Sequence, residues 1–205
     1  MKKNNLIIAA ALACSSLVGA EPIDLSLKKV DQTRIAQISP HLSKAQALFI
    51  EGKNTESSAE IFKAADQIHK LGVSDDVPPT KLITKAVTQL ERLGERVLDG
   101  SIKNVKTLTN NFALASYEIA THYADQADQA LAKNTPATEP LKRCADHTES
   151  LAHWAGKPLT KDDLAILKAL RKPQKPNEKL LKDARSLIAK LHAGSGLEKF
   201  IPFKK

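Results

Sequence analysis

The residues best suited to chemistry lie in one short stretch, LKRCADHTESLAHWAG, at residues 141–156. The stretch contains Cys144, the only tryptophan of the chain (Trp154) and two of its six histidines, His147 and His153. Thiolate and imidazole groups bind zinc and copper, and imidazole is also an axial ligand of haem. These residue types therefore raise the hypothesis of a metal or haem site.

Covalent attachment of haem does not fit the spacing of these residues. The motif C-x-x-C-H supplies two thiols and an iron-ligating histidine. Here Cys144 is followed by ADHT, so His147 stands where the second cysteine should be. The only methionine is Met1, at the start of the chain, which excludes a methionine axial ligand in the mature protein. Haem held non-covalently by two histidines is the form that remains.

An ion shared between two helices is the other form of the hypothesis. His122 follows Glu118 by four residues, and His147 follows Cys144 by three. Either spacing places both side chains on one face of a helix. If the two helices are antiparallel neighbours, His122, Cys144 and His147 are candidate ligands for zinc or copper.

A structural role for the cysteine competes with this metal site. Five residues are spaced 3, 4, 3, 4, which is the pattern of a buried helical seam: Leu141, Cys144, Thr148, Leu151 and Ala155. Free cysteine usually packs as a small hydrophobic residue. We therefore favour a protein without a cofactor and keep the zinc, copper or haem site as the alternative.

The sequence contains no set of residues that is typical of an enzyme. The motifs G-x-S-x-G and H-E-x-x-H are absent, and no glycine-rich phosphate loop occurs. The stretch SLKK at residues 26–29 matches S-x-x-K, but its partner motifs S-D-N and K-T-G are missing. We therefore expect a non-enzymatic protein.

Helices must position these residues, because aromatic residues make up only 4% of the chain and no stretch alternates in the way that a strand does. Glycines mark several of the helix ends. We predict helices at about residues 40–51, 55–72, 80–100, 101–133, 141–156, 160–172 and 178–194. Their short connections favour antiparallel neighbours.

The predicted fold is an all-α antiparallel bundle of four main helices, with shorter helices at both ends. The alternative is a tetratricopeptide-like helical repeat array, because Phe49, Ser58, Phe62 and Ala65 stand near positions that such a repeat fills with aromatic and small residues. No second copy follows at a period of 34 residues, and a stable array needs at least three.

The N-terminus predicts export. Lys2 and Lys3 precede an apolar run, and small residues end at Ala20, which is the pattern of a bacterial secretory signal at residues 1–20. The protein would then be periplasmic or secreted. Alternatively, AALAC is a lipoprotein box, and the protein is anchored through a lipidated Cys14. Without Cys14 the mature chain has one cysteine, so it cannot form an internal disulfide.

The rest of the chain divides into three parts: an N-terminal segment with a short helix at 21–38, a helical bundle at 39–172, and a basic amphipathic helix with a tail at 173–205. Positive charge is concentrated near the C-terminus. Residues 21–140 contain 14 basic and 16 acidic residues, whereas residues 141–205 contain 15 basic and 7 acidic ones.

This charge asymmetry predicts an anionic partner. The candidate binding residues are Lys168, Arg171, Lys172, Lys175, Lys179, Lys182, Arg185 and Lys190. Nucleic acid is disfavoured because export separates the protein from it. We expect an exported, non-enzymatic binding or structural protein of the bacterial cell envelope, whose basic C-terminal part engages an anionic envelope component or another protein. The alternative is a periplasmic bundle that binds metal or haem.

Overall fold

The computed structural model describes residues 40–72, 80–172 and 177–195, and these residues form helices and no strands. The helices are α2 (Pro40–Ile50), α3 (Asn54–Gly72), α4 (Lys81–Leu98), α5 (Val105–Ala132), α6 (Thr138–Trp154), α7 (Lys161–Leu170) and α8 (Glu178–Gly194). The all-α prediction is confirmed. The predicted signal peptide, the 21–38 segment, Lys175 and the tail lie outside the described residues.

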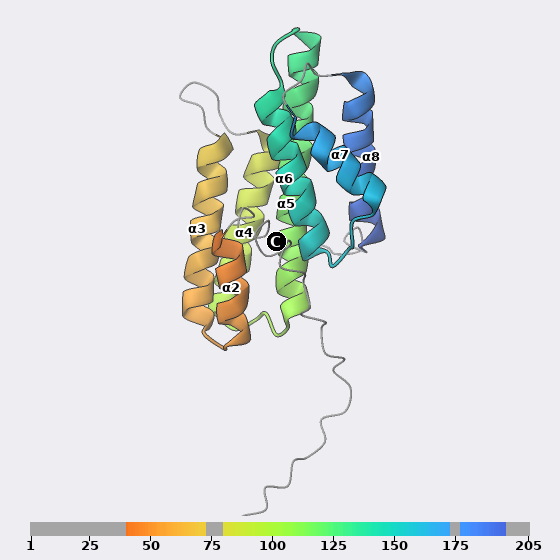
Figure 1. Ribbon diagram of the computed structural model, residues 1–205. Helices are drawn as coiled ribbons and strands as arrows, with labels where there is room; N and C mark the ends of the chain where they lie inside the picture. Colours follow the sequence, from red (N-terminus) through yellow and green to blue (C-terminus); the bar gives the residue numbers. More distant parts are fainter. Residues whose placement is uncertain (1–39, 73–79, 173–176, 196–205) are drawn as a thin grey trace, which may run out of the picture.

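The long helices form an antiparallel bundle around α5 (Figure 1). Helices α3, α4, α5 and α6 alternate in direction, and α7 crosses α6 obliquely before the chain returns along α8. Helix α5 packs against α2, α4, α6 and α8. In a repeat array each unit contacts only its neighbours, whereas α5 also contacts helices that are distant in the sequence. The architecture is therefore a bundle.

Side chains that cap the backbone set the beginnings of several helices. Thr80, Asn104 and Asn177 each accept a hydrogen bond from the backbone amide three residues later. Thr160 and Asp163 form a reciprocal capping box at the start of α7. Helices therefore begin where a polar side chain satisfies an amide that has no partner within the helix.

The start of α5 differs from the prediction. The sequence places it at residue 101, whereas the helix begins at Val105. Gly100 has a φ of 73°, a left-handed conformation that ends α4. The Asp99 carboxylate then accepts a hydrogen bond from the Ser101 amide at 2.7 Å. This turn delays the helix until Asn104 can cap it.

The apolar seams of the helices form the core. All five apolar seam residues of α4 are fully buried: Ile83, Ala86, Leu90, Leu93 and Val97. The apolar face of α8 is also buried, and its residues are Leu180, Leu181, Ala184, Leu187, Ile188 and Leu191. Because α8 packs against α5, α6 and α7, the basic C-terminal helix belongs to the same packed unit. None of the helices in the described ranges is long and apolar enough to cross a membrane.

Candidate functional site

Three of the predicted anion-binding residues form ion pairs within the protein. Arg171 bridges to Asp146 at 2.9 Å and to Glu149 at 2.5 Å, both on α6. Arg185 of α8 pairs with two carboxylates of α5, Asp125 and Asp128, and Lys190 of α8 pairs with Asp163 of α7 at 2.9 Å. The positive charge of the C-terminal part therefore serves in part to hold α7 and α8 against the bundle.

Four other predicted residues remain exposed: Lys168, Lys172, Lys179 and Lys182. None of them makes an ion pair with a carboxylate in the described part of the chain. We call these four residues the lysine corner, because they flank the connection between the end of α7 and the start of α8. The end of α7 and the start of α8 lie in the upper part of the molecule in Figure 1.

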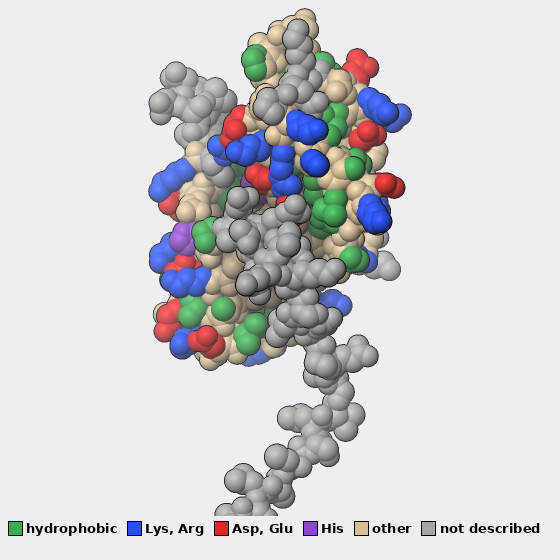
Figure 2. Space-filling view, viewed as in Figure 1, with side chains coloured by type: hydrophobic (Ala, Val, Ile, Leu, Met, Phe, Trp, Pro, Cys, Tyr) green, Lys and Arg blue, Asp and Glu red, His purple; other side chains and the backbone are tan. Residues whose placement is uncertain are grey.

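The charge of the lysine corner is partly balanced along α8. Glu178 and Asp183 lie beside its lysines in the sequence, so the described corner has four positive and two negative groups. Figure 2 shows Lys and Arg side chains gathered on the upper part of this face, over α6 and α7. The surface is therefore moderately, not densely, positive.

Of the three predicted metal ligands, Cys144 and His122 are buried, whereas His147 is partly exposed and lines a cavity. Cys144 is fully buried, and burial raises the pKa of its thiol to about 11. His122 is 3% exposed, its Nδ1 lies 3.0 Å from the Thr80 hydroxyl, and burial lowers its pKa. Burial, together with Arg143 and His122, lowers the pKa of His147 to about 4. At neutral pH these residues are therefore a thiol and two neutral imidazoles.

No three His, Cys, Asp or Glu side chains of the described ranges are grouped so that they could hold a metal ion. The acidic residues that accompany the histidines in the sequence have basic partners on other helices. Glu118 pairs with Lys85 of α4, Asp125 pairs with Arg185, and Glu149 pairs with Arg171. The zinc, copper or haem site stays a prediction, which metal analysis of the purified protein would decide.

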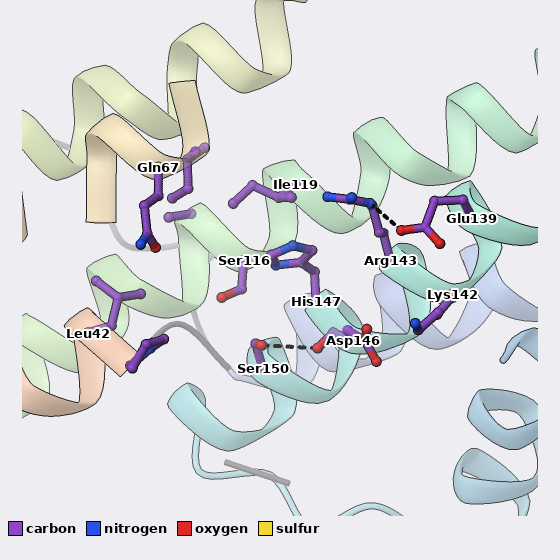
Figure 3. A pocket seen from close by; sticks show the side chains of 13 residues that line it. Leu42, Gln67, Ser116, Ile119, Glu139, Lys142, Arg143, Asp146, His147 and Ser150 are labelled. Carbon is purple, nitrogen blue, oxygen red and sulfur yellow. Dashed lines mark hydrogen bonds and ion pairs between the residues drawn. The ribbon is translucent and has the colours of Figure 1, made fainter. Parts of the chain in front are cut away.

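A cavity of about 290 Å³ lies where α2, α3, α5 and α6 meet (Figure 3). Its apolar lining comes mainly from α2, α3 and α5, and its polar lining comes mainly from α6. The lining consists of Pro40, Leu42, Gln67, Ile68, Ala115, Ser116, Ile119, Glu139, Lys142, Arg143, Asp146, His147 and Ser150.

Of the residues that line this cavity, the sequence singled out only His147, as a candidate metal ligand. The only pattern within α6 that indicates a shared polar wall is the spacing of Arg143 and His147, which are four residues apart and so lie on one face of the helix. The apolar wall comes from three other helices, and no pattern within α6 indicates which of them will lie opposite.

Comparisons of the chain with protein-family models, with curated proteins and with solved structures found no match. We therefore infer a function from the residues of the chain and their geometry.

Proposed function

We propose that this protein is an exported, non-enzymatic binding protein of the bacterial cell envelope, and that its lysine corner docks on a surface rich in phosphate groups. The observation that carries the proposal is the exposure of Lys168, Lys172, Lys179 and Lys182 without internal ion pairs, while other basic residues of the same segment are paired. Phosphate groups occur both in lipid headgroups and in envelope polymers, and the test below separates the two sources.

The expected attraction is modest. A lysine near an anionic membrane surface contributes about 1 kcal/mol, and Glu178 and Asp183 offset part of the total. The interaction should weaken with added salt, because the Debye length falls from about 10 Å at 0.1 M to about 3 Å at 1 M. Binding of this strength suits a protein that is held near a surface reversibly.

Export is the second part of the proposal and rests on residues 1–20, which lie outside the described residues. Mass spectrometry of the protein from its native host distinguishes the two processing routes. Cleavage after Ala20 gives a free periplasmic or secreted protein. Cleavage before Cys14 gives a lipid-modified N-terminus. An intact N-terminus that starts at Met1 would contradict export.

Vesicle co-sedimentation tests the lysine corner. The mature chain should bind vesicles that contain phosphatidylglycerol at low salt, and it should be released at high salt. Each of two double variants, Lys168→Gln/Lys172→Gln and Lys179→Gln/Lys182→Gln, should weaken binding by roughly 25-fold, since each lost charge is worth about fivefold. The matched control is Lys103→Gln/Lys106→Gln, which removes the same charge near the start of α5, at the opposite end of the bundle in Figure 1.

The outcomes separate the possible partners. Equal effects of the control and the two corner variants would show that only net charge matters and would refute the lysine corner as the site. Binding to a soluble polyphosphate, but not to vesicles, would assign the surface to an envelope polymer. Absence of binding to both at low salt would refute the anionic partner and leave the protein partner as the remaining interpretation.

A further inference from the structure

The cavity between α2, α3, α5 and α6 has the size and lining of a site for a small ligand. Ligand pockets in proteins have volumes of about 300–1,000 Å³, are mostly apolar, and contain a few placed polar groups. This cavity, at about 290 Å³, lies just below the lower limit of that range. A water molecule takes about 30 Å³ in the liquid, so the space suits a molecule of about ten non-hydrogen atoms.

One wall of the cavity is apolar and comes from separate helices. Leu42 of α2, Ile68 of α3 and both Ala115 and Ile119 of α5 line it, and all four are buried. These helices pack against one another, since α2 contacts both α3 and α5. An apolar chain placed here would contact side chains that the fold already holds in position.

The opposite wall offers hydrogen-bond donors from α6. The Arg143 Nε donates to Glu139 at 2.8 Å, and its Nη1 donates to the Tyr123 hydroxyl at 3.4 Å. A guanidinium group has five N–H donors. The other three make no hydrogen bond within the described part of the chain. Figure 3 shows the Arg143 and His147 side chains extending from α6 toward Ile119.

Tyr123 of α5 holds these two donors in place. Its ring stacks on the His147 ring at 5.8 Å with an interplanar angle of 13°, and the Arg143 guanidinium lies 5.6 Å from the centre of the same ring. Neither ring nitrogen of His147 has a hydrogen-bond partner among the described residues. A neutral imidazole has one N–H, so it can donate to a ligand beside the guanidinium.

The acidic residues of the cavity do not neutralise these donors completely. Glu139 is bonded to Arg143 through Nε and the Tyr123 hydroxyl through Nη1, which leaves one N–H of Nη1 and both N–H groups of Nη2 available. Asp146 is bonded to Arg171, which lies outside the lining. Lys142 is exposed and also lines the cavity. The polar wall therefore presents more available hydrogen-bond donors than available carboxylate acceptors.

We propose that this cavity binds a small organic carboxylate with a short aliphatic body, whose carboxylate is held by Arg143 and His147 and whose chain lies against Leu42, Ile68 and Ile119. A guanidinium binds a carboxylate through two parallel hydrogen bonds, which fixes its orientation as well as its charge. This site is separate from the lysine corner, and the proposal stands if docking on anionic surfaces is refuted.

Calorimetric titration of the mature chain with octanoate tests the site, because octanoate has a carboxylate and the right number of atoms. Octanoate should bind saturably with one molecule per chain. Octanol, which lacks the charge, and octylammonium, which reverses it, should each bind at least about tenfold more weakly. Comparable binding of all three would overturn the carboxylate assignment.

Variants locate the site. Arg143→Gln should weaken octanoate binding by at least about tenfold, and Ala115→Met should abolish it by filling the apolar wall. Lys106→Gln, which removes an exposed charge outside the cavity, should leave binding unchanged. Circular dichroism verifies that each variant is folded. In the unmodified protein, octanoate should shift the methyl NMR signals of Leu42, Ile68 and Ile119. Shifts confined to other methyl groups, or binding that survives both cavity variants, would refute the proposal.

Discussion

Glu60 offers a sharp test of how the N-terminal helices are held together. Its side chain is 5% exposed, although it is a carboxylate. The Oε2 atom lies 2.6 Å from the His41 Nδ1, and Oε1 lies 3.0 Å from the Nζ atoms of both Lys44 and Lys63. His41 and Lys44 belong to α2, whereas Glu60 belongs to α3. Glu60→Gln keeps the size of the side chain and removes the charge, so it should loosen α2 from α3.

The magnitude follows from the pKa of Glu60. Hydrogen bonds from His41, Lys63 and Lys44 lower this pKa from 4.5 to about 2. At about 1.4 kcal/mol per pKa unit, the ceiling on the stabilisation is about 3.5 kcal/mol. The two lysines are 62% and 57% exposed, so water screens their charges strongly. We therefore expect Glu60→Gln to lower the free energy of unfolding by about 1–2 kcal/mol at neutral pH.

The pH dependence has a definite sign. A carboxyl group with a lowered folded-state pKa stabilises the protein above its unfolded pKa, near 4.5, and loses that contribution as the pH falls toward 2. Urea denaturation, followed by the fluorescence of Trp154, measures both proteins at several pH values. The difference between wild type and variant should be full at about pH 7 and should shrink steadily between about pH 5 and pH 3.

A matched control is Glu91→Gln, which removes an exposed carboxylate from α4 and should change stability by less than about 0.5 kcal/mol. Equal losses in the two variants would refute the reasoning, because the buried cluster would then contribute no more than a surface charge. A difference that stayed constant down to about pH 3 would also refute it, since the effect would not come from the ionised carboxylate.

Three further predictions follow from the packing. Cys144 is buried, and burial raises the pKa of its thiol to about 11. Mass spectrometry should therefore show that Cys144 resists iodoacetamide in the native protein and reacts fully in urea. Rapid alkylation of the native protein would contradict its burial. Asn104→Ala removes the cap of α5 and should cost about 1 kcal/mol in urea denaturation, whereas Asn104→Asp should cost little; equal losses in both would contradict a capping role. Arg171→Met should destabilise the protein more than Arg185→Met, because the Arg171 partner Glu149 is 14% exposed, whereas the two Arg185 partners are 43% and 45% exposed. Exposed ion pairs contribute only about 0–1 kcal/mol. If the urea midpoints fell in the reverse order, solvent exposure would not govern the strength of these pairs.

The helices and their buried faces were predictable from the sequence because they depend on neighbours within a few residues. The spacing of Ile83, Leu90 and Val97 specifies the inner face of α4, and all three are fully buried. The capping box of α7 is also a local feature, because Thr160 and Asp163 are only three residues apart. The start of α5 was misplaced because Gly100 was interpreted only as the end of α4. The turn that follows, in which the Ser101 amide donates to the Asp99 carboxylate, was not predicted.

The candidate sites could be predicted only in part. The eight basic residues of the C-terminal part share a charge, and the sequence does not distinguish those that pair internally from those that remain exposed. Arg185 pairs with Asp125 across 60 residues of chain, which depends on how α8 is rotated against α5. The buried Glu60 cluster was missed for the same reason, since His41 lies 19 residues away on another helix.

The sequence by itself therefore determined the helical class, the approximate bounds of the helices, the amphipathic faces and the uneven distribution of charge, because each of these depends on composition or on contacts within one helical turn. Tertiary structure alone decided which lysines stay exposed, which carboxylates are paired, and where Arg143 and His147 meet an apolar wall from three other helices. These outcomes depend on the rotation and register of packed helices, and small changes in either would exchange the partners without altering the pattern of any single helix.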